Sequence, residues 1–215
     1  DVYKRQDNGS VMQLCVERTA ESYDWTTRLA EEPLVSAVQH LEKDIGQPFA
    51  QGYRSEIQPH LGAWLKSLTG GLQRGLALFI DYGYPRSEFY SAERTDGTLM
   101  CHYRQRAHDD VFFWPGLQDI TSWVDFTALA EAADACGLDV EGYTSQAMFL
   151  VGCGLDRLLA EKMEASEDGG LAVNAEVRQL TLPGMMGERF QVMGLGRGLE
   201  QPLRGFSPLD LRYRL

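Results

Sequence analysis

Side chains able to do chemistry gather in one short stretch of the sequence, between residues 101 and 110. It holds two histidines, two arginines and two aspartates: His102, Arg104, Arg106, His108, Asp109 and Asp110. An imidazole or a carboxylate can accept a proton or orient a nucleophile. The stretch therefore predicts a polar pocket wall, in which His108 and Asp109 are catalytic and His102 and Arg104 bind substrate. A solvated, salt-bridged loop is the alternative.

The same side chains suggest a metal-dependent hydrolase, because imidazole and carboxylate ligands suit several divalent ions. Such an enzyme would use His102, His108, Asp109 and Asp110. The two histidines are six residues apart in an expected loop, unlike the i, i+4 pair of a helical zinc site. We therefore expect no metal.

A further carboxylate, Asp81, directly follows the apolar run Leu76–Ile80. Such a run is typical of a strand buried on both faces of a parallel sheet. Ligands of open α/β sheets bind beyond the carboxyl ends of the strands. We therefore predict that Asp81 is catalytic and that Tyr82 and Gly83 bind substrate. Capping of the following turn by the Asp81 carboxylate is the alternative.

Three more carboxylates lie near expected helix starts or loops. Glu56 belongs to Ser55–Gln58, which has the spacing of a capping box and predicts a helix start. Asp125 is expected to cap the helix 126–136. Glu56 and Asp119 are also candidate substrate-binding residues.

The elements expected to position these side chains alternate between strand and helix, which predicts an α/β layered sheet. Residues 17–32 look irregular, residues 84–120 form a long excursion with a tight turn or hairpin at 95–98, and 164–170 is a polar linker. The expected strands are 11–17, 76–80, 138–143 and 190–195, and the expected helices are 33–41, 59–69, 126–136, 146–163 and 171–180.

Composition excludes several classes of protein. The net charge of −11 has no offsetting basic block, which argues against a nucleic-acid-binding surface. The four cysteines are widely spaced, which favours reduced thiols in a cytoplasmic protein. The longest apolar run is too short to cross a bilayer, so no membrane partner is expected. The chain opens without Met on a polar stretch, which suggests a truncation or processing point.

Several stretches resemble the MidA-like family of S-adenosylmethionine-dependent methyltransferases. The likeness runs from about residue 52 to residue 197. It is carried by Gly52-Tyr-Arg-Ser-Glu-Ile, Phe79-Ile-Asp-Tyr-Gly-Tyr-Pro-Arg, Gly97-Thr-Leu-Met-Cys-His-Tyr-Arg, Ala107-His-Asp-Asp, Pro115-Gly-Leu-Gln-Asp-Ile-Thr, Val124-Asp-Phe-Thr-Ala-Leu-Ala and Pro183-Gly-Met-Met-Gly-Glu-Arg-Phe.

The resemblance implies a Rossmann-like class I methyltransferase sheet, of which this chain would hold strands five to seven with the last strand antiparallel. Residues 52–197 would be the C-terminal half of the methyltransferase domain, 1–51 the tail of the preceding half, and 198–215 a C-terminal tail. The glycine-rich loop and acidic residues that hold most of the cofactor in this family are not found, so the cofactor-binding residues stay unknown.

The same resemblance implies a function. The cofactor would be S-adenosyl-L-methionine and the substrate a protein. In mitochondrial relatives, which assist assembly of respiratory complex I, the methyl acceptor is arginine. A mitochondrial location, as in those relatives, is the alternative to a cytoplasmic one. A homodimer is a separate expectation, which the resemblance does not supply. The alternative is a non-catalytic assembly module that grips its partner with the aromatic, histidine-rich excursion.

Overall fold

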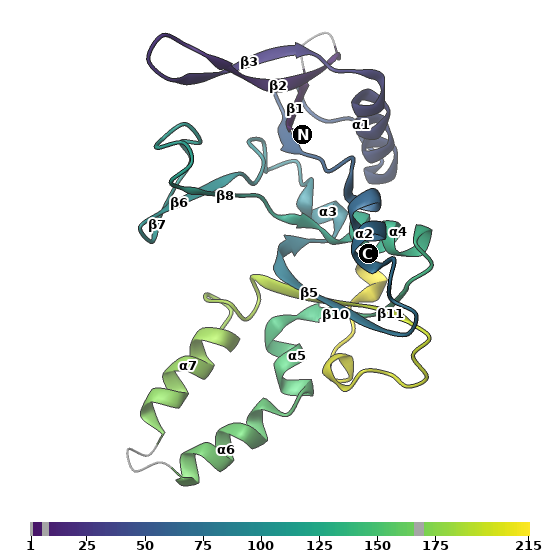
Figure 1. The fold of residues 1–215 in the computed structure, drawn as a ribbon, viewed down its shortest axis with the longest axis vertical. Coiled ribbons are helices and arrows are strands. Elements are labelled where there is room, and N and C mark those ends of the chain that lie inside the picture. The colour runs from purple at the N-terminus through teal and green to yellow at the C-terminus, as the bar shows by residue number, and fades with distance from the viewer. Residues whose placement is uncertain (1, 6–8, 166–169) are drawn as a thin grey trace. The chain divides into compact units, whose positions relative to one another are not determined.

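A computed structural model describes residues 2–5, 9–165 and 170–215 (Figure 1). The chain forms two compact units. Unit 1 comprises Asp1–His60 and Arg86–Trp123, and unit 2 comprises Leu61–Pro85 and Val124–Leu215. This division differs from the boundaries expected at residues 51 and 197, which stay a prediction.

Unit 1 begins with a four-stranded antiparallel sheet in the order β3-β2-β1-β4 and a helix, α1. The predicted helix is present, and its apolar stripe of Leu34, Val38 and Leu41 is buried. The bounds are β1 Val2–Arg5, β2 Val11–Arg18, β3 Tyr23–Leu29, α1 Glu32–Ile45 and β4 Arg54–Glu56.

Two predictions for unit 1 were wrong. Residues 17–32 are not irregular, because β3 pairs with β2 along its whole length. Most of its side chains are exposed, so β3 lacks the alternation that marks a half-buried strand. Ser55 and Glu56 lie in β4 and form no capping box, since Ser55 pairs with Tyr3 of β1 and the next helix begins only at Leu61.

The excursion belongs to unit 1 and contains a short helix and three strands. These are α3 Arg86–Phe89, β6 Met100–Tyr103, β7 Arg106–His108 and β8 Asp119–Thr121. The strands form an antiparallel sheet in the order β7-β6-β8. The tight hairpin joins β6 to β7 through Arg104 and Gln105, whose φ angles are 47° and 64°. Positive φ at both positions is typical of a type I′ turn, so the hairpin lies later than the expected 95–98.

Unit 2 is built on a four-stranded sheet in the order β10-β11-β5-β9. The last strand, β11, is antiparallel to both of its neighbours, as predicted. β5 and β9 run parallel, paired only at Gly83 and Tyr84 of β5. The bounds are β5 Gly75–Tyr84, β9 Val124–Asp125, β10 Asp139–Ser145 and β11 Phe190–Arg197.

Helices cover one face of the unit 2 sheet and part of the other. On one face α2 and α4 pack over a core that includes Leu65, Phe126, Met193 and Leu195. The other face of β10 and β11 is covered by Phe206, whose ring also contacts Phe149 of α5. The helices are α2 Leu61–Thr69, α4 Phe126–Ala135, α5 Gln146–Gly152, α6 Leu155–Ala165, α7 Leu171–Thr181, and the 3-10 turns η1 Arg204–Phe206 and η2 Arg212–Arg214.

The helical predictions for unit 2 largely hold. Asp125 caps α4, accepting a hydrogen bond from the Ala128 backbone N at 3.0 Å. The single helix expected over 146–163 is split into α5 and α6 at Gly154, whose φ of 90° suits glycine. The expected linker 164–170 lies mostly outside the described residues. No helix of the described chain has the length and apolarity needed to span a membrane.

The prediction that β5 is buried on both faces was wrong. Ala77 and Phe79 pack against the core, but Leu76, Leu78 and Ile80 are 39%, 39% and 47% exposed. An unbroken apolar run cannot distinguish a strand that is buried on both faces from a strand with one exposed face. In both cases apolar residues lie on both faces of the strand.

Candidate functional site

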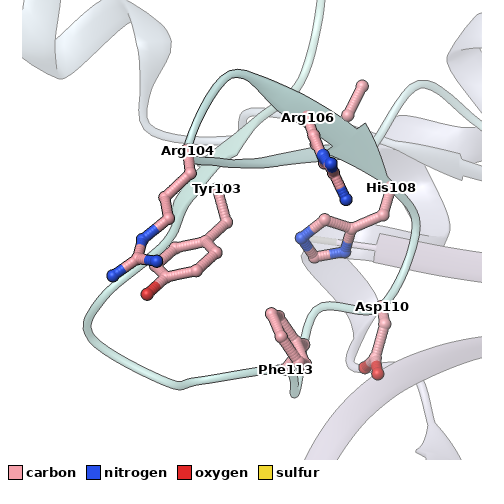
Figure 2. A pocket seen from close by; sticks show the side chains of 7 residues that line it. Tyr103, Arg104, Arg106, His108, Asp110 and Phe113 are labelled. Carbon is pink, nitrogen blue, oxygen red and sulfur yellow. The ribbon is translucent and has the colours of Figure 1, made fainter.

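The β6–β7 hairpin of unit 1 forms one wall of a pocket of about 760 Å³. Figure 2 shows the side chains of Tyr103, Arg106 and His108 on the same side of the hairpin, with Phe113 facing them across the pocket. The complete lining consists of Tyr103, Arg104, Arg106, Ala107, His108, Asp110 and Phe113.

Strand alternation decides which side chains share the pocket. Tyr103 pairs with Arg106 and Cys101 with His108, so these four residues point to one face of the hairpin. His102 alternates with them and lies on the opposite face, where its cross-strand neighbour is Asp119 of β8. The four ligands of the hydrolase hypothesis therefore do not share a face, because His102 and His108 point apart.

Aromatic rings make up much of the pocket wall. The Phe113 ring stands edge-on to the Tyr103 ring at 5.8 Å and to the His108 ring at 5.4 Å between centroids. The Arg104 guanidinium lies 5.4 Å from the centre of the Tyr103 ring. A planar group entering the pocket would meet ring faces and edges on both sides.

Two polar groups remain available to a ligand. His108 Nε2 is buried and has no hydrogen-bond partner among the described residues. Asp110 is held by its own turn, since its Oδ1 accepts from the Phe112 backbone N at 3.0 Å. Within the described residues, no hydrogen bond to its second carboxylate oxygen is found. Asp109 is exposed and does not line the pocket.

The stretch predicted to form a pocket wall does line a pocket, but not all of its members face that pocket. Arg106 belonged to the predicted wall without a role of its own, and Phe113 lines the pocket but was not predicted to. His102 and Asp119 were predicted to bind substrate together with the rest of the stretch, but they lie on the other face of the hairpin. If the stretch had been predicted as a hairpin and not as a loop, the alternation of side chains along a strand would have placed Arg106 on the same face as His108.

Glu56 is a buried residue of unit 1, 7% exposed, and does not line the hairpin pocket. Its carboxylate accepts hydrogen bonds from Thr98, near the start of β6. The Glu56 carboxylate therefore anchors Thr98, and its role in substrate binding stays a prediction.

The predicted residues of unit 2 lie together on β5. Asp81 is exposed, sits within the strand opposite Gln191, and its Oδ1 accepts from the Tyr82 backbone N at 2.8 Å. The Tyr82 ring packs 4.0 Å from the Phe190 ring. Gly83 is buried where a side chain would collide with the Val124 carbonyl and the Phe126 ring, which gives it a packing reason to be glycine. Because Asp81 and the hairpin belong to different units, a pocket shared by the two stays a prediction.

The hairpin pocket does not suit the cofactor that the sequence led us to expect. The sulfonium of S-adenosyl-L-methionine is a cation, and the pocket already holds the Arg104 and Arg106 guanidinium groups against the single carboxylate of Asp110. Like charges in close contact repel. We therefore place no cofactor in this pocket.

Comparison with known proteins identifies the family. Residues 1–144 match the model of a family described as putative S-adenosyl-L-methionine-dependent methyltransferases, and the chain belongs to that family. The predicted cofactor is thus confirmed for the family as a whole. A search of curated proteins found no match.

Two solved structures from Burkholderia thailandensis are similar to the whole chain. One, an uncharacterised protein, has 35% sequence identity and a TM-score of 0.90. The other is a candidate methyl transferase bound to S-adenosyl-homocysteine. It has 35% identity and a TM-score of 0.89. All of this chain is covered in both matches, but it spans only 56% and 54% of the two relatives.

Proposed function

We propose that this chain supplies the substrate side of an S-adenosyl-L-methionine-dependent methyltransferase of the MidA-like kind. In that assignment β5, β10 and β11 are strands five, six and seven of a class I sheet. The observation that carries the proposal is the TM-score of 0.89 over the whole chain to a relative bound to S-adenosyl-homocysteine. The part of that relative outside the match would supply most of the cofactor contacts.

The proposed substrate is a protein side chain such as arginine. Methyl transfer requires the acceptor nitrogen to be aligned with the methyl group and to lose a proton. A carboxylate is suited to both tasks, because it holds a guanidinium through two hydrogen bonds and can accept its proton. Asp81 is exposed and spends only one oxygen on the Tyr82 backbone, so it can perform them.

The hairpin pocket would hold a different part of the protein substrate. Arg104 and Arg106 suit an anionic group, such as an acidic side chain beside the acceptor, and the Tyr103 and Phe113 rings suit an apolar or planar neighbour. His108 Nε2, which has no hydrogen-bond partner in the described part of the chain, offers one further hydrogen bond. In this proposal the hairpin positions the substrate and takes no direct part in methyl transfer.

A chimera tests the proposal. Residues 1–215 would replace the matching segment of the S-adenosyl-homocysteine-bound relative, and transfer of labelled methyl from S-adenosyl-L-methionine to peptides would be followed. We expect methylation of an arginine peptide carrying acidic neighbours, and loss of at least tenfold in rate for Asp81→Asn. An unchanged rate in Asp81→Asn would remove Asp81 from the mechanism, and a folded chimera that binds cofactor but methylates no protein would remove the activity.

A second experiment measures cofactor binding by the chain alone. Residues 1–215 by themselves should show no submicromolar binding of S-adenosyl-L-methionine in calorimetry, whereas the chimera should bind it. Tight binding by residues 1–215 alone would mean that the cofactor site has been misplaced.

One observation favours a second candidate, a non-catalytic interaction module. The excursion exposes Phe113, Trp114 and Leu117, which are 40%, 54% and 63% accessible. Exposed aromatic residues of this kind are enriched at protein interfaces. Methyl transfer by the chimera separates the two candidates, because a pure binding module would bind its partner without labelling it.

A further inference from the structure

The helices α6 and α7 carry no buried residue, although both contain leucine and other apolar side chains. Leu158 of α6 is 51% exposed and Leu171 of α7 is 74% exposed. Figure 1 shows the two helices extending away from the sheet of unit 2. We call α6 and α7 together the helical arm.

The contacts that hold the helical arm leave one face of α6 open. Gln146 of α5 donates from Nε2 to the Leu180 carbonyl of α7 at 2.9 Å, and Met163 of α6 packs against Gly170 at the start of α7. Leu158 lies about 140° around the helix from Met163, because successive residues of an α-helix turn by about 100°. Leu158 therefore lies on a different side of α6 from the contact with α7.

The length of the two helices indicates that the open face has a partner. Each helix has 11 residues. Isolated helices shorter than about 12–15 residues are marginal in water, and most helices in proteins are stabilised by packing of an apolar face. A further surface packed on α6 would supply that stabilisation.

The charges beside Leu158 are complementary to themselves. Arg157 and Glu161 flank Leu158 on the same side and form an ion pair of 3.7 Å within α6, with side chains 72% and 63% exposed. Two copies of α6 that pack antiparallel, with Leu159 at the midpoint, place Arg157 of each copy opposite Glu161 of the other. A two-fold interface requires a surface of this kind, because the same patch serves both subunits.

The overall charge of the protein also favours this surface for contact between copies. The net charge of −11 makes two copies repel each other over most of their surfaces. The helical arm is close to neutral, with three basic and four acidic residues. These are Arg157, Lys162 and Arg178, and Asp156, Glu161, Glu164 and Glu176.

We propose that the helical arm is a homodimer interface and that its occupant is a second copy of this chain. α6 packs antiparallel on α6 of the second copy, with Leu158 against Leu158 and Arg157 paired with Glu161 across the two-fold axis. The proposal goes beyond methyl transfer, because it concerns assembly and holds whether or not the protein transfers a methyl group.

Sedimentation equilibrium of residues 1–215 tests the proposal. We expect the wild-type chain to form a dimer. Leu158→Glu should raise the dissociation constant about tenfold or more, because two carboxylates would face each other in the interface. If residues 1–215 aggregate, the chimera described above allows the same measurement.

A charge exchange tests the pairing itself. Glu161→Arg should weaken the dimer, because it places arginines opposite each other. Adding Arg157→Glu to that variant should restore the wild-type dissociation constant, since the complementary pattern is then reversed but intact. The two variants separate a specific antiparallel pairing from general apolar association.

The matched control is Leu68→Glu on α2, which changes a helical leucine of unit 2 that is 57% exposed and lies outside the helical arm. It should leave the dissociation constant unchanged. Circular dichroism of each variant shows whether the fold is kept.

Three results would overturn the proposal. One is a wild-type chain that stays monomeric at every concentration tested. Another is a dimer that Leu158→Glu leaves intact, because its interface would lie elsewhere on the protein. The third is a dimer that Leu158→Glu weakens but that the exchanged charges do not restore, because α6 would then not pack antiparallel on its own copy.

Discussion

The Glu56 carboxylate holds Thr98 through two hydrogen bonds to a single oxygen. Oε2 accepts from the Thr98 backbone N and from its Oγ1, each at 2.9 Å. Thr98 Oγ1 in turn accepts from the Trp123 backbone N at 3.0 Å. Thr98 precedes β6 and Trp123 follows β8, so one buried carboxylate ties together the two ends of the hairpin sheet.

Removing that carboxylate should loosen the hairpin sheet. We expect Glu56→Ala to lower the free energy of unfolding by about 2–4 kcal/mol, since hydrogen bonds to a charged group are strong and Thr98 would lose its acceptor. Hydrogen exchange of residues 98–123 should accelerate, while that of α4 should not. Glu93→Ala, an exposed glutamate of the same unit, is the control and should change stability by less than about 0.5 kcal/mol. Unaltered exchange in Glu56→Ala would show that the contact does not hold the sheet.

Cys101 should be the least reactive of the four thiols toward alkylation. Burial raises the pKa of the Cys101 thiol, and the negative charges of Asp110 and Asp109 raise it further. The thiolate is the reactive form, so both effects slow the reaction. At pH 8 we expect iodoacetamide to label Cys101 more slowly than the half-buried Cys15, as followed by mass spectrometry of peptides. Equal rates at the two thiols would contradict the buried placement of Cys101.

Unit 1 should lose stability in alkali because of Tyr53. Burial raises the pKa of Tyr53 from 10.0 to about 12. The unfolded chain therefore releases this proton first, so the stabilisation is complete below pH 10 and is lost as the pH rises toward 12. A shift of this size corresponds to about 2–3 kcal/mol.

Tyr53→Phe tests the alkaline prediction, because phenylalanine keeps the ring that stacks on Phe49 at 4.5 Å and has no proton to lose. The variant should show a shallower fall in stability between pH 10 and 12 in denaturant titrations. Tyr213→Phe changes a tyrosine that is 80% exposed and should leave the wild-type profile unaltered. If the Tyr53→Phe and wild-type profiles coincide, Tyr53 ionises as readily in the folded protein as in the unfolded chain.

Local signals in the sequence located the elements that short-range physics determines. The apolar stripe of Leu34, Val38 and Leu41 marked α1, and Asp125 marked the start of α4, because a helix repeats every 3.6 residues and its first turn needs a hydrogen-bond acceptor. The α/β class of the fold followed from the alternation of strands and helices, and the family followed from the resemblance of longer stretches of sequence. The antiparallel last strand came from the resemblance and was confirmed.

Long-range pairing accounts for most of the misses. Ser55 and Glu56 look like a helix start, but the pairing of Ser55 with Tyr3, more than fifty positions earlier, makes them a strand. The separation of His102 from His108 depends on a hairpin turn through Arg104 and Gln105, which are not residues that usually favour positive φ. The sequence therefore located the stretch that lines the hairpin pocket, but it did not show which side chains lie on which face.

Gly83 should be the least replaceable glycine of unit 2 near the predicted site. A methyl group at this position would overlap the Val124 carbonyl oxygen and lie 2.9 Å from the Phe126 ring. Both obstacles are fixed, since Val124 pairs with Gly83 and Phe126 is fully buried. We expect Gly83→Ala to lower the free energy of unfolding by about 1–3 kcal/mol, the usual range for overpacking.

Gly62→Ala is the matched control, because a methyl group there meets nothing within 4 Å and lies in α2. Alanine is favoured over glycine in a helix, so this variant should be neutral or more stable by up to about 1 kcal/mol. Denaturant titration of both variants gives the comparison. A Gly83→Ala variant as stable as Gly62→Ala would mean that β5 and β9 do not approach this closely, and Gly83 would then need a functional reason, such as substrate contact, to be glycine.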